Sequence, residues 1–456
     1  MINKNYYKTL SATLAVATVL VIAGCSVSKD EEYVNNSDGE HAIEVDGESA
    51  EYSNIKVVKT GDSDDGDEAD FYGDNAAIFA TNGATLTLSN INVETDGTHA
   101  NAVFSYGEGT TVNISNSEIS TTGNCSGGLM TCGGGTMNAE NLTIHTTGNS
   151  SAAIRSDRGG GTVNVTGGSY TTDGKGSPVI YSTADITVSD AKMESTSSQG
   201  VVVEGKNSVT LKNVDLIADN NTKNSDKSEY YQAVMIYQSM SGDAAQGKAS
   251  FTMEDSDLTN ANGDIFFVTN TVADINLSSS DIVNNGDGVF LRAATAGWGN
   301  EGSNGGQITL NADDQKIDGD IVVDDVSVLN MYLDNGSELT GAINTDDQSG
   351  EVYVELSDDS NWSLTGDSYI SALTCDADAI KLNGYKLYVN GEEYKEGTTS
   401  EGEAIEIKQS SSEGGMPGDK PDGNPPEKPS GEKPDGNPPE KPSGEKPDGE
   451  PPAKRE

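Results

Sequence analysis

Apolar and polar residues alternate in short runs along most of the chain. The segments 84–97, 110–123, 135–148, 161–174 and 184–197 share one pattern, as in "TTVNISNSEISTTG" and "GTVNVTGGSYTTDG". Such runs are rich in Val, Ile and Thr and are separated by Gly, Asn and Asp, which is typical of β-strands between tight turns. Single strands of this kind cannot bury their apolar faces, so the pattern predicts that the strands stack.

The spacing of these runs indicates how they stack. Their leading apolar residues recur every 23 to 26 positions, from Leu86 through Val112, Met137, Val163 and Ile186 to Val209. A second strand precedes each of these runs, as in "AAIFA", "NAVFS" and "SPVIYS", and no helical periodicity lies between them. A period near 25 with two or three strands per repeat predicts an all-β parallel β-helix, in which each coil pairs with its neighbours.

The period also suggests domain boundaries. We expect the β-helix over 43–345, interrupted by insertions at about 219–231 and 293–306, and last coils with a β-hairpin cap over 346–408. Asn-Gly pairs in "KLNGYKLYVNGEEY" indicate the hairpins of that cap. The segment 409–456 repeats "KPDGNPPEKPSGE" and is predicted to be a disordered tail, because this composition cannot form a core.

The first residues have the features of an export signal. Lys4 and Lys8 precede an apolar run that ends in "IAGC" at Cys25. This ending resembles the lipobox of bacterial lipoproteins, which implies a signal peptide over 1–24, a lipidated Cys25 and a tether over 25–42. The expected location is then the outer face of the cell membrane, and an ordinary signal peptide with a chance cysteine remains the alternative.

Alternation also assigns the two faces of the strands that precede each repeat. One set of residues is predicted to face inward: Ile78, Val103, Leu129, Ile154, Ile180 and Val202. The residues between them are predicted to face outward: Phe79, Phe104, Met130, Arg155, Tyr181 and Val203. An unpaired buried guanidinium would be costly, which supports an outward Arg155. The candidate ligand contacts are therefore Phe104, Arg155, Arg158 and Tyr181, with Trp298 from the second insertion.

The acidic stretch "GDSDDGDEADFYGDN" is a candidate calcium site. Asp62, Asp64, Asp67 and Asp70 offer the dense oxygen ligands that this hard cation prefers. A solvated acidic loop is an equal alternative, because the spacing departs from that of the EF-hand. Among the cysteines, Cys125 and Cys132 are close enough in sequence for a disulfide, and the three histidines do not have the spacing of a zinc site.

Charge restricts the partners. The formal net charge is −47, which disfavours nucleic acid and anionic lipid surfaces. A neutral or cationic glycan or a host surface protein remains compatible, and the only membrane contact expected is the lipid anchor.

The stretches "ADFYGDNAA", "AAIRSDRGGGTV", "SPVIYSTADITV", "VVVEGKNSV" and "YQSMSGDAA" carry a resemblance to a known group. They resemble uncharacterised adhesin-like surface lipoproteins of anaerobic Firmicutes, which are described as right-handed β-helices. More distantly, the chain is similar to β-helical carbohydrate-binding proteins of cellulolytic clostridia, which associate with polysaccharides and calcium. The resemblance implies a right-handed solenoid, and it brings no established activity with it.

Three function classes follow. The first is binding or adhesion to a polysaccharide or host surface. The second is a polysaccharide lyase or glycoside hydrolase, for which Arg155, Asp157 and Arg158 could imitate a catalytic centre, although the motifs of the β-helix hydrolases are not assembled. The third is a passive surface spacer. We expect Asp157, between two arginines, to be ionised and paired rather than poised as a base.

Overall fold

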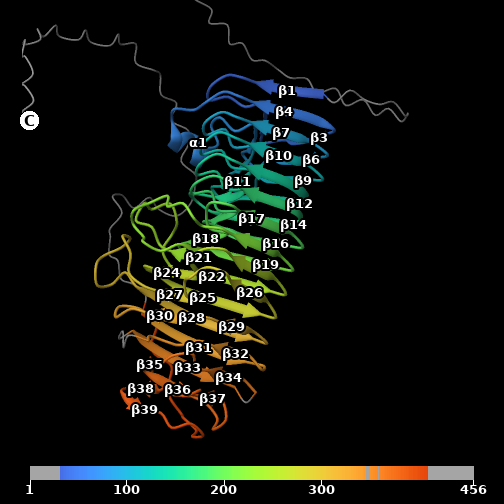
Figure 1. Ribbon diagram of the computed structural model, residues 1–456. Coiled ribbons are helices and arrows are strands. Elements are labelled where there is room, and N and C mark those ends of the chain that lie inside the picture. Colours follow the sequence, from blue (N-terminus) through green and yellow to red (C-terminus); the bar gives the residue numbers. More distant parts are fainter. Residues whose placement is uncertain (1–30, 346–349, 358, 409–456) are drawn as a thin grey trace, which may run out of the picture. The chain divides into compact units, whose positions relative to one another are not determined.

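Short parallel strands wind into successive coils in the computed structural model, which describes residues 31–345, 350–357 and 359–408. Figure 1 shows the coils stacked one above another from β1 at one end to β39 at the other. Each strand pairs with the strand one coil later in the sequence, which is the arrangement of a parallel β-helix. The predicted all-β fold is therefore confirmed.

Three faces make up each coil. The first ladder holds β3 (Ser49–Ser53), β6 (Thr85–Ser89), β9 (Thr111–Ser115), β12 (Gly135–Thr146), β14 (Gly161–Thr172), β16 (Asp185–Ser189), β19 (Ser208–Lys212), β22 (Lys248–Glu254), β25 (Thr271–Ser278), β28 (Gly306–Asp313), β31 (Val328–Asp334), β33 (Glu351–Leu356) and β36 (Ala372–Thr374). The second holds β1 (Glu31–Asn35), β4 (Ile55–Lys59), β7 (Asn92–Thr95), β10 (Glu118–Thr121), β17 (Lys192–Ser195), β20 (Asp215–Ala218), β23 (Asp257–Asn260) and β26 (Asp281–Asn284). The long strands β12 and β14 belong to both ladders and join them into one sheet.

The third face carries the candidate site. Its sheet consists of β2 (Ile43–Asp46), β5 (Ile78–Thr81), β8 (Val103–Tyr106), β11 (Leu129–Cys132), β13 (Ile154–Ser156), β15 (Ile180–Ser182), β18 (Val201–Glu204), β21 (Gln232–Tyr237), β24 (Asp264–Thr269), β27 (Leu291–Ala293) and β30 (Ile321–Val323). Two small sheets complete the described strands: β29 (Lys316–Asp318), β32 (Glu338–Thr340), β34 (Asn361–Ser363) and β37 (Ile380–Lys381), and then β35 (Ser368–Ile370), β38 (Leu387–Val389) and β39 (Glu392–Glu393). We call the outward side of the eleven-stranded sheet the outer face.

The sequence specifies the corners between strands through residues that tolerate the left-handed backbone. Asn54, Asn90, Asn116 and Asn141 all have φ between 48° and 55° at the corner between the first two ladders. Asparagine adopts this conformation more readily than most residues, so its recurrence sets where each coil turns. The side-chain amide of Asn141 also donates to the Asn116 side chain one coil earlier, at 2.9 Å.

The coil interior is a continuous apolar core. Ile78, Val103, Leu129, Ile154 and Ile180 are aligned in one inward row, as predicted. The predicted inward direction of the last residue in this row, Val202, is wrong. Ile180 pairs with Val201, so Val202 aligns with Tyr181 and faces outward, while Val203 belongs to the core. Three consecutive valines give no alternation from which that register could be read.

The ends of the solenoid differ in detail from the predicted boundaries. β1 pairs with β4, so the segment expected as a tether already contributes a strand. One of the two expected hairpins is present, because Asn390-Gly391 joins the antiparallel pair β38 and β39. The other is not, because β37 and β38, on either side of Asn383-Gly384, pair in parallel with earlier strands. Cys25 and the segment 409–456 lie outside the described residues.

The described helix is α1 (Gly66–Tyr72), within the acidic stretch. Asp65 caps its N-terminus by accepting a hydrogen bond from the Glu68 amide, and Gly73 ends it in a left-handed conformation. In the part of the chain that the structure describes, no helix has the length and apolar character needed to cross a bilayer.

Candidate functional site

The outer face carries two apolar clusters beyond the main core. The first consists of Ala76, Phe79, Phe104, Met130 and Cys132, with Tyr106 against it. The second consists of Val202, Met235, Tyr237, Phe267 and Ala294, with Tyr181, Ala296 and Trp298 against it. The expected outward direction of Phe79, Phe104, Met130 and Tyr181 is therefore correct.

The expectation that this row is exposed is wrong in the first coils. Phe104 is fully buried, because α1 and the residues after it lie over the sheet. Tyr72 packs edge-on against Tyr106, and a Cβ atom at Gly73 would lie 2.4 Å from the Phe79 ring. Phe104 is thus part of a structural cluster and does not contact a ligand in this conformation.

Arg155 faces outward, yet it is shielded rather than free. Its Nη2 lies 2.6 Å from Asp157 Oδ2 and 3.8 Å from Asp70 Oδ2, and 14% of its side chain is exposed. Burial raises the pKa of Asp157, while the Arg155 guanidinium opposes that shift. The expected pairing of Asp157 is confirmed, and the pair joins the sheet to α1.

Arg158 belongs to the same structural junction. Its guanidinium lies 3.8 Å from the Phe71 ring centroid and pairs with Asp243 at 2.7 Å. A cation stacked on an aromatic ring and held by a carboxylate has little freedom to bind a ligand. Arg158 connects α1 to the loop after β21.

A pocket opens further along the outer face, where the first insertion crosses it. Its cavity volume is about 140 Å³. Aromatic side chains line it from strands and insertions alike: Tyr181, Tyr230, Tyr231, Tyr237 and Trp298. Polar side chains complete it: Gln199, Asn220, Lys223, Asn224, Ser225 and Gln232. We call this the insertion pocket, and of the predicted contact residues it brings together Tyr181 and Trp298.

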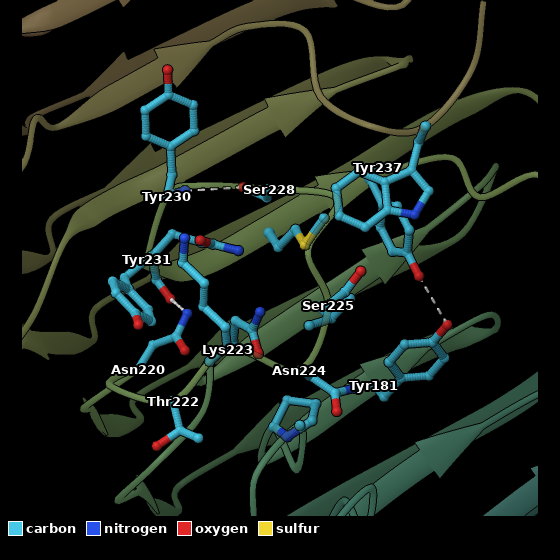
Figure 2. Close-up of a pocket in the computed structure, with 17 residues that line it drawn as sticks. Tyr181, Asn220, Thr222, Lys223, Asn224, Ser225, Ser228, Tyr230, Tyr231 and Tyr237 are labelled. Atoms are coloured by element: carbon cyan, nitrogen blue, oxygen red, sulfur yellow. Dashed lines mark hydrogen bonds between the residues drawn. The ribbon is translucent and has the colours of Figure 1, made fainter. Parts of the chain in front are cut away.

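The floor of the insertion pocket is held by a buried hydrogen-bond network. Figure 2 shows the phenols of Tyr181 and Tyr237 turned toward each other. Their oxygens lie within hydrogen-bond distance, at 3.2 Å. Both donate to Glu204 Oε2 beneath them, Tyr237 at 2.9 Å. Burial raises the pKa of both phenols well above the usual range, and the carboxylate of Glu204 adds to the shift. Both tyrosines therefore stay neutral and hold fixed orientations.

The two insertions meet at the pocket rim. The Gly297 amide donates to the Lys227 carbonyl at 2.7 Å, and Lys227 Nζ lies 5.7 Å from the Trp298 ring centroid. Tyr237 packs edge-on against Trp298 with ring centroids 5.2 Å apart. Trp298 is thus positioned by a strand and by the other insertion.

Gln232 supplies an unused polar group. It is 2% exposed, and its Oε1 has no hydrogen-bond partner among the residues that the structure describes. A buried amide oxygen without a partner is costly, so a ligand hydroxyl or a water that donates to it would be favoured.

The acidic stretch does not assemble the four predicted aspartates. Asp62 Oδ1 accepts from the Thr98 amide at 2.7 Å, and Asp70 Oδ1 lies 2.9 Å from His99 Nδ1. That hydrogen bond, with a second between the His99 ring and the Cys125 sulfur, raises the pKa of His99 to about 10. Calcium binding by Asp62, Asp64, Asp67 and Asp70 stays a prediction, which melting with and without a chelator would test.

The predicted disulfide is absent. Cys125 and Cys132 are both free, since Cys125 lies at a coil corner and Cys132 at the far end of the extended strand β11. At about 3.3 Å per strand residue, β11 alone separates them beyond disulfide reach. Among the described residues, Asp70, His99 and Cys125 form the one group of three potential metal ligands whose donor atoms lie within 4.8 Å of one another.

No family model, no curated protein and no solved structure matches the chain. The family resemblance inferred from the sequence therefore stays a prediction. Sequence reasoning missed Tyr230, Gln232 and Tyr237 in the pocket, although "SEYYQAVMIY" directly follows the first insertion. It also missed that His99 and Cys125 lie close together. They occupy equivalent positions in successive repeats, and this spacing could have indicated their proximity.

Proposed function

We propose that the protein is a surface-anchored binding protein that takes a carbohydrate in the insertion pocket. The observation that supports this most is that aromatic residues, with Trp298 at the rim, line the same pocket as amides that can hydrogen-bond. Tyr230 is 37% exposed, Trp298 is half-buried, and Asn224 and Gln232 line the same pocket. Sugar rings pack their apolar faces on aromatic side chains while their hydroxyls bond to amides.

The geometry favours binding over a passive spacer. A spacer has no use for two insertions that meet and fix a tryptophan at the rim of a pocket. It also favours binding without cleavage. Arg155, which a lyase would use as its base, is occupied by Asp157 and Asp70.

A glycan array with the soluble fragment 26–456 would identify the ligand. Trp298→Ala and Tyr230→Ala should then each weaken binding by about 1 to 3 kcal/mol, because each removes an aromatic surface from the pocket. Affinity would be measured by calorimetry, with melting curves to verify folding. The matched control is Tyr385→Ala, which removes an exposed tyrosine from a coil near the other end of the described chain.

Equal affinity in the parent, Trp298→Ala and Tyr230→Ala would refute the pocket as the binding site. Release of reducing ends or unsaturated sugars from the bound glycan would instead identify an enzyme.

Anchoring through Cys25 is the second part of the proposal. Cys25→Ala should move the protein from the membrane fraction to the medium, because two acyl chains give stable attachment and their loss leaves none. Cell fractionation with a lipid label measures this, and unchanged fractionation with no loss of the lipid label would refute anchoring through Cys25.

A further inference from the structure

One corner of the coil carries unusual residues in two successive repeats. Among the described residues, every non-glycine residue with a positive φ is Asn, Asp or Ser apart from His99 and Cys125. Their φ angles are 57° and 55°, and the same corner holds Ser150 and Gly176 in the next two coils. Histidine, like Asn and Asp, tolerates this conformation, whereas cysteine has no such preference. Backbone preference therefore does not explain why a cysteine stands at Cys125, directly beside the histidine of the preceding coil.

His99 and Cys125 are neighbours across the stack. The His99 amide donates to the Asn124 carbonyl at 2.9 Å, and the Cys125 amide donates to the Asn149 carbonyl at 2.8 Å. Adjacent coils lie about 4.8 Å apart, so equivalent side chains project side by side.

α1 brings a third donor to this corner. Asp70 Oδ1 lies 2.9 Å from His99 Nδ1, and the helix is held close because a Cβ atom at Gly66 would lie 3.0 Å from His99 Cε1. One donor atom from each of Asp70, His99 and Cys125 lies within 4.8 Å of the other two. All three residues are partly exposed, so an ion can reach them from solvent.

We propose that Asp70, His99 and Cys125 bind a zinc ion. Imidazole nitrogen, thiolate sulfur and carboxylate oxygen are the ligands that zinc takes in proteins, and three of them leave a fourth position for water. The set does not suit calcium, which takes six to eight oxygen ligands. On binding, zinc replaces the proton between His99 and Asp70 and the thiol proton of Cys125, and both protons pass to solvent.

The site differs from the calcium site expected from the sequence, with which it shares Asp70 alone. It is also separate from the insertion pocket, whose lining includes none of its three residues. Zinc binding would tie α1 to two coils and so fix the segment that covers Phe104.

The experiment uses the purified full-length chain, stripped of metal with a chelator. We expect one zinc per chain by elemental analysis, and with Co²⁺ in its place a thiolate-to-metal charge-transfer band. Cys125→Ser should abolish the band, and His99→Asn should weaken zinc binding by at least about tenfold, the lower end of the loss seen when a supporting partner of a metal site is removed. Serine and asparagine occupy equivalent left-handed corners elsewhere, so both variants should fold, which melting curves verify.

Cys375→Ser is the matched control, since Cys375 is buried in the last coils and should leave the band unchanged. The proposal is overturned if the parent gives no charge-transfer band, or if the band persists in Cys125→Ser. It is also overturned if zinc fails to slow the alkylation of Cys125, because that result would assign the cluster to an accessible thiol without a metal.

Discussion

At the residue scale, Arg155 shows what one sequence can and cannot tell. Alternation predicted that it faces outward, and the neighbouring Asp157 predicted an ion pair, and both are correct. The contact with Asp70 could not be predicted, because it depends on how an insertion 85 residues earlier folds back over the sheet. This contact changes the expected role of Arg155 from ligand contact to structural junction.

Arg155→Ala should therefore destabilise the protein rather than weaken ligand binding alone. Asp157 is 4% exposed and would lose the guanidinium that bonds its Oδ2 through both Nε and Nη2. Removal of one partner from a buried pair costs about 3 to 5 kcal/mol. Denaturant unfolding would measure the loss in free energy of unfolding.

A second variant separates the unpaired charge from lost packing. Arg155→Met with Asp157→Asn should recover most of the stability, because no buried charge remains. If Arg155→Ala unfolds at the same denaturant concentration as the parent, the pair is exposed enough in solution to contribute nothing.

At the element scale, α1 was the feature hardest to predict. Helices this short are marginal by themselves and depend on tertiary packing, so the sequence carries little signal for them. The acidic residues around Asp64 and Asp67 instead indicated a loop or a cation site. The structure uses this segment as a cover, with Phe71 and Tyr72 packed toward the outer face. The acidic composition of the segment was visible in the sequence, but composition does not say over which strands a segment lies.

The positions of the insertions near the pocket could be predicted, but their contacts could not. Both were located from the sequence because they break a regular repeat, and both leave the strands near the predicted positions, after β20 and after β27. Trp298 and Tyr181 were named as candidates for their chemistry, whereas Tyr237 was missed. Its place depends on the register of β21 against β18, which pairs Glu204 with Tyr237 on the far side of an insertion.

At the scale of the whole molecule, the sequence predicts the fold well because every coil repeats the same information. Each strand that alternates clearly supports the placement of its neighbours in the stack. The valines of β18 show the limit, because without alternation their predicted register was wrong by one residue. The functional site has no such redundancy. It lies where the repeat is broken, so each of its contacts depends on a tertiary arrangement that occurs once.

Buried tyrosines distributed along the solenoid make its stability depend on alkaline pH. Burial raises the pKa of Tyr181 and Tyr237 well above the usual range, and it raises the pKa of Tyr353, in the last coils, to about 12. A phenol in the unfolded chain has a pKa of about 10. Above that pH the unfolded chain loses protons that the folded chain keeps, so the free energy of unfolding falls as the pH rises.

The contribution of these phenols is therefore complete below about pH 10 and is progressively lost above it, as the pH approaches and passes the folded-state values. We expect tyrosinate absorbance to rise in two phases, first from exposed phenols and then steeply, together with loss of the β-sheet circular dichroism signal. Tyr170→Phe should reduce only the second phase, because Tyr170 is fully buried in the coil interior and donates to the Gly167 carbonyl at 3.0 Å. A single gradual phase centred near the ordinary phenol pKa, with circular dichroism unchanged throughout, would show that water reaches these phenols in the folded protein.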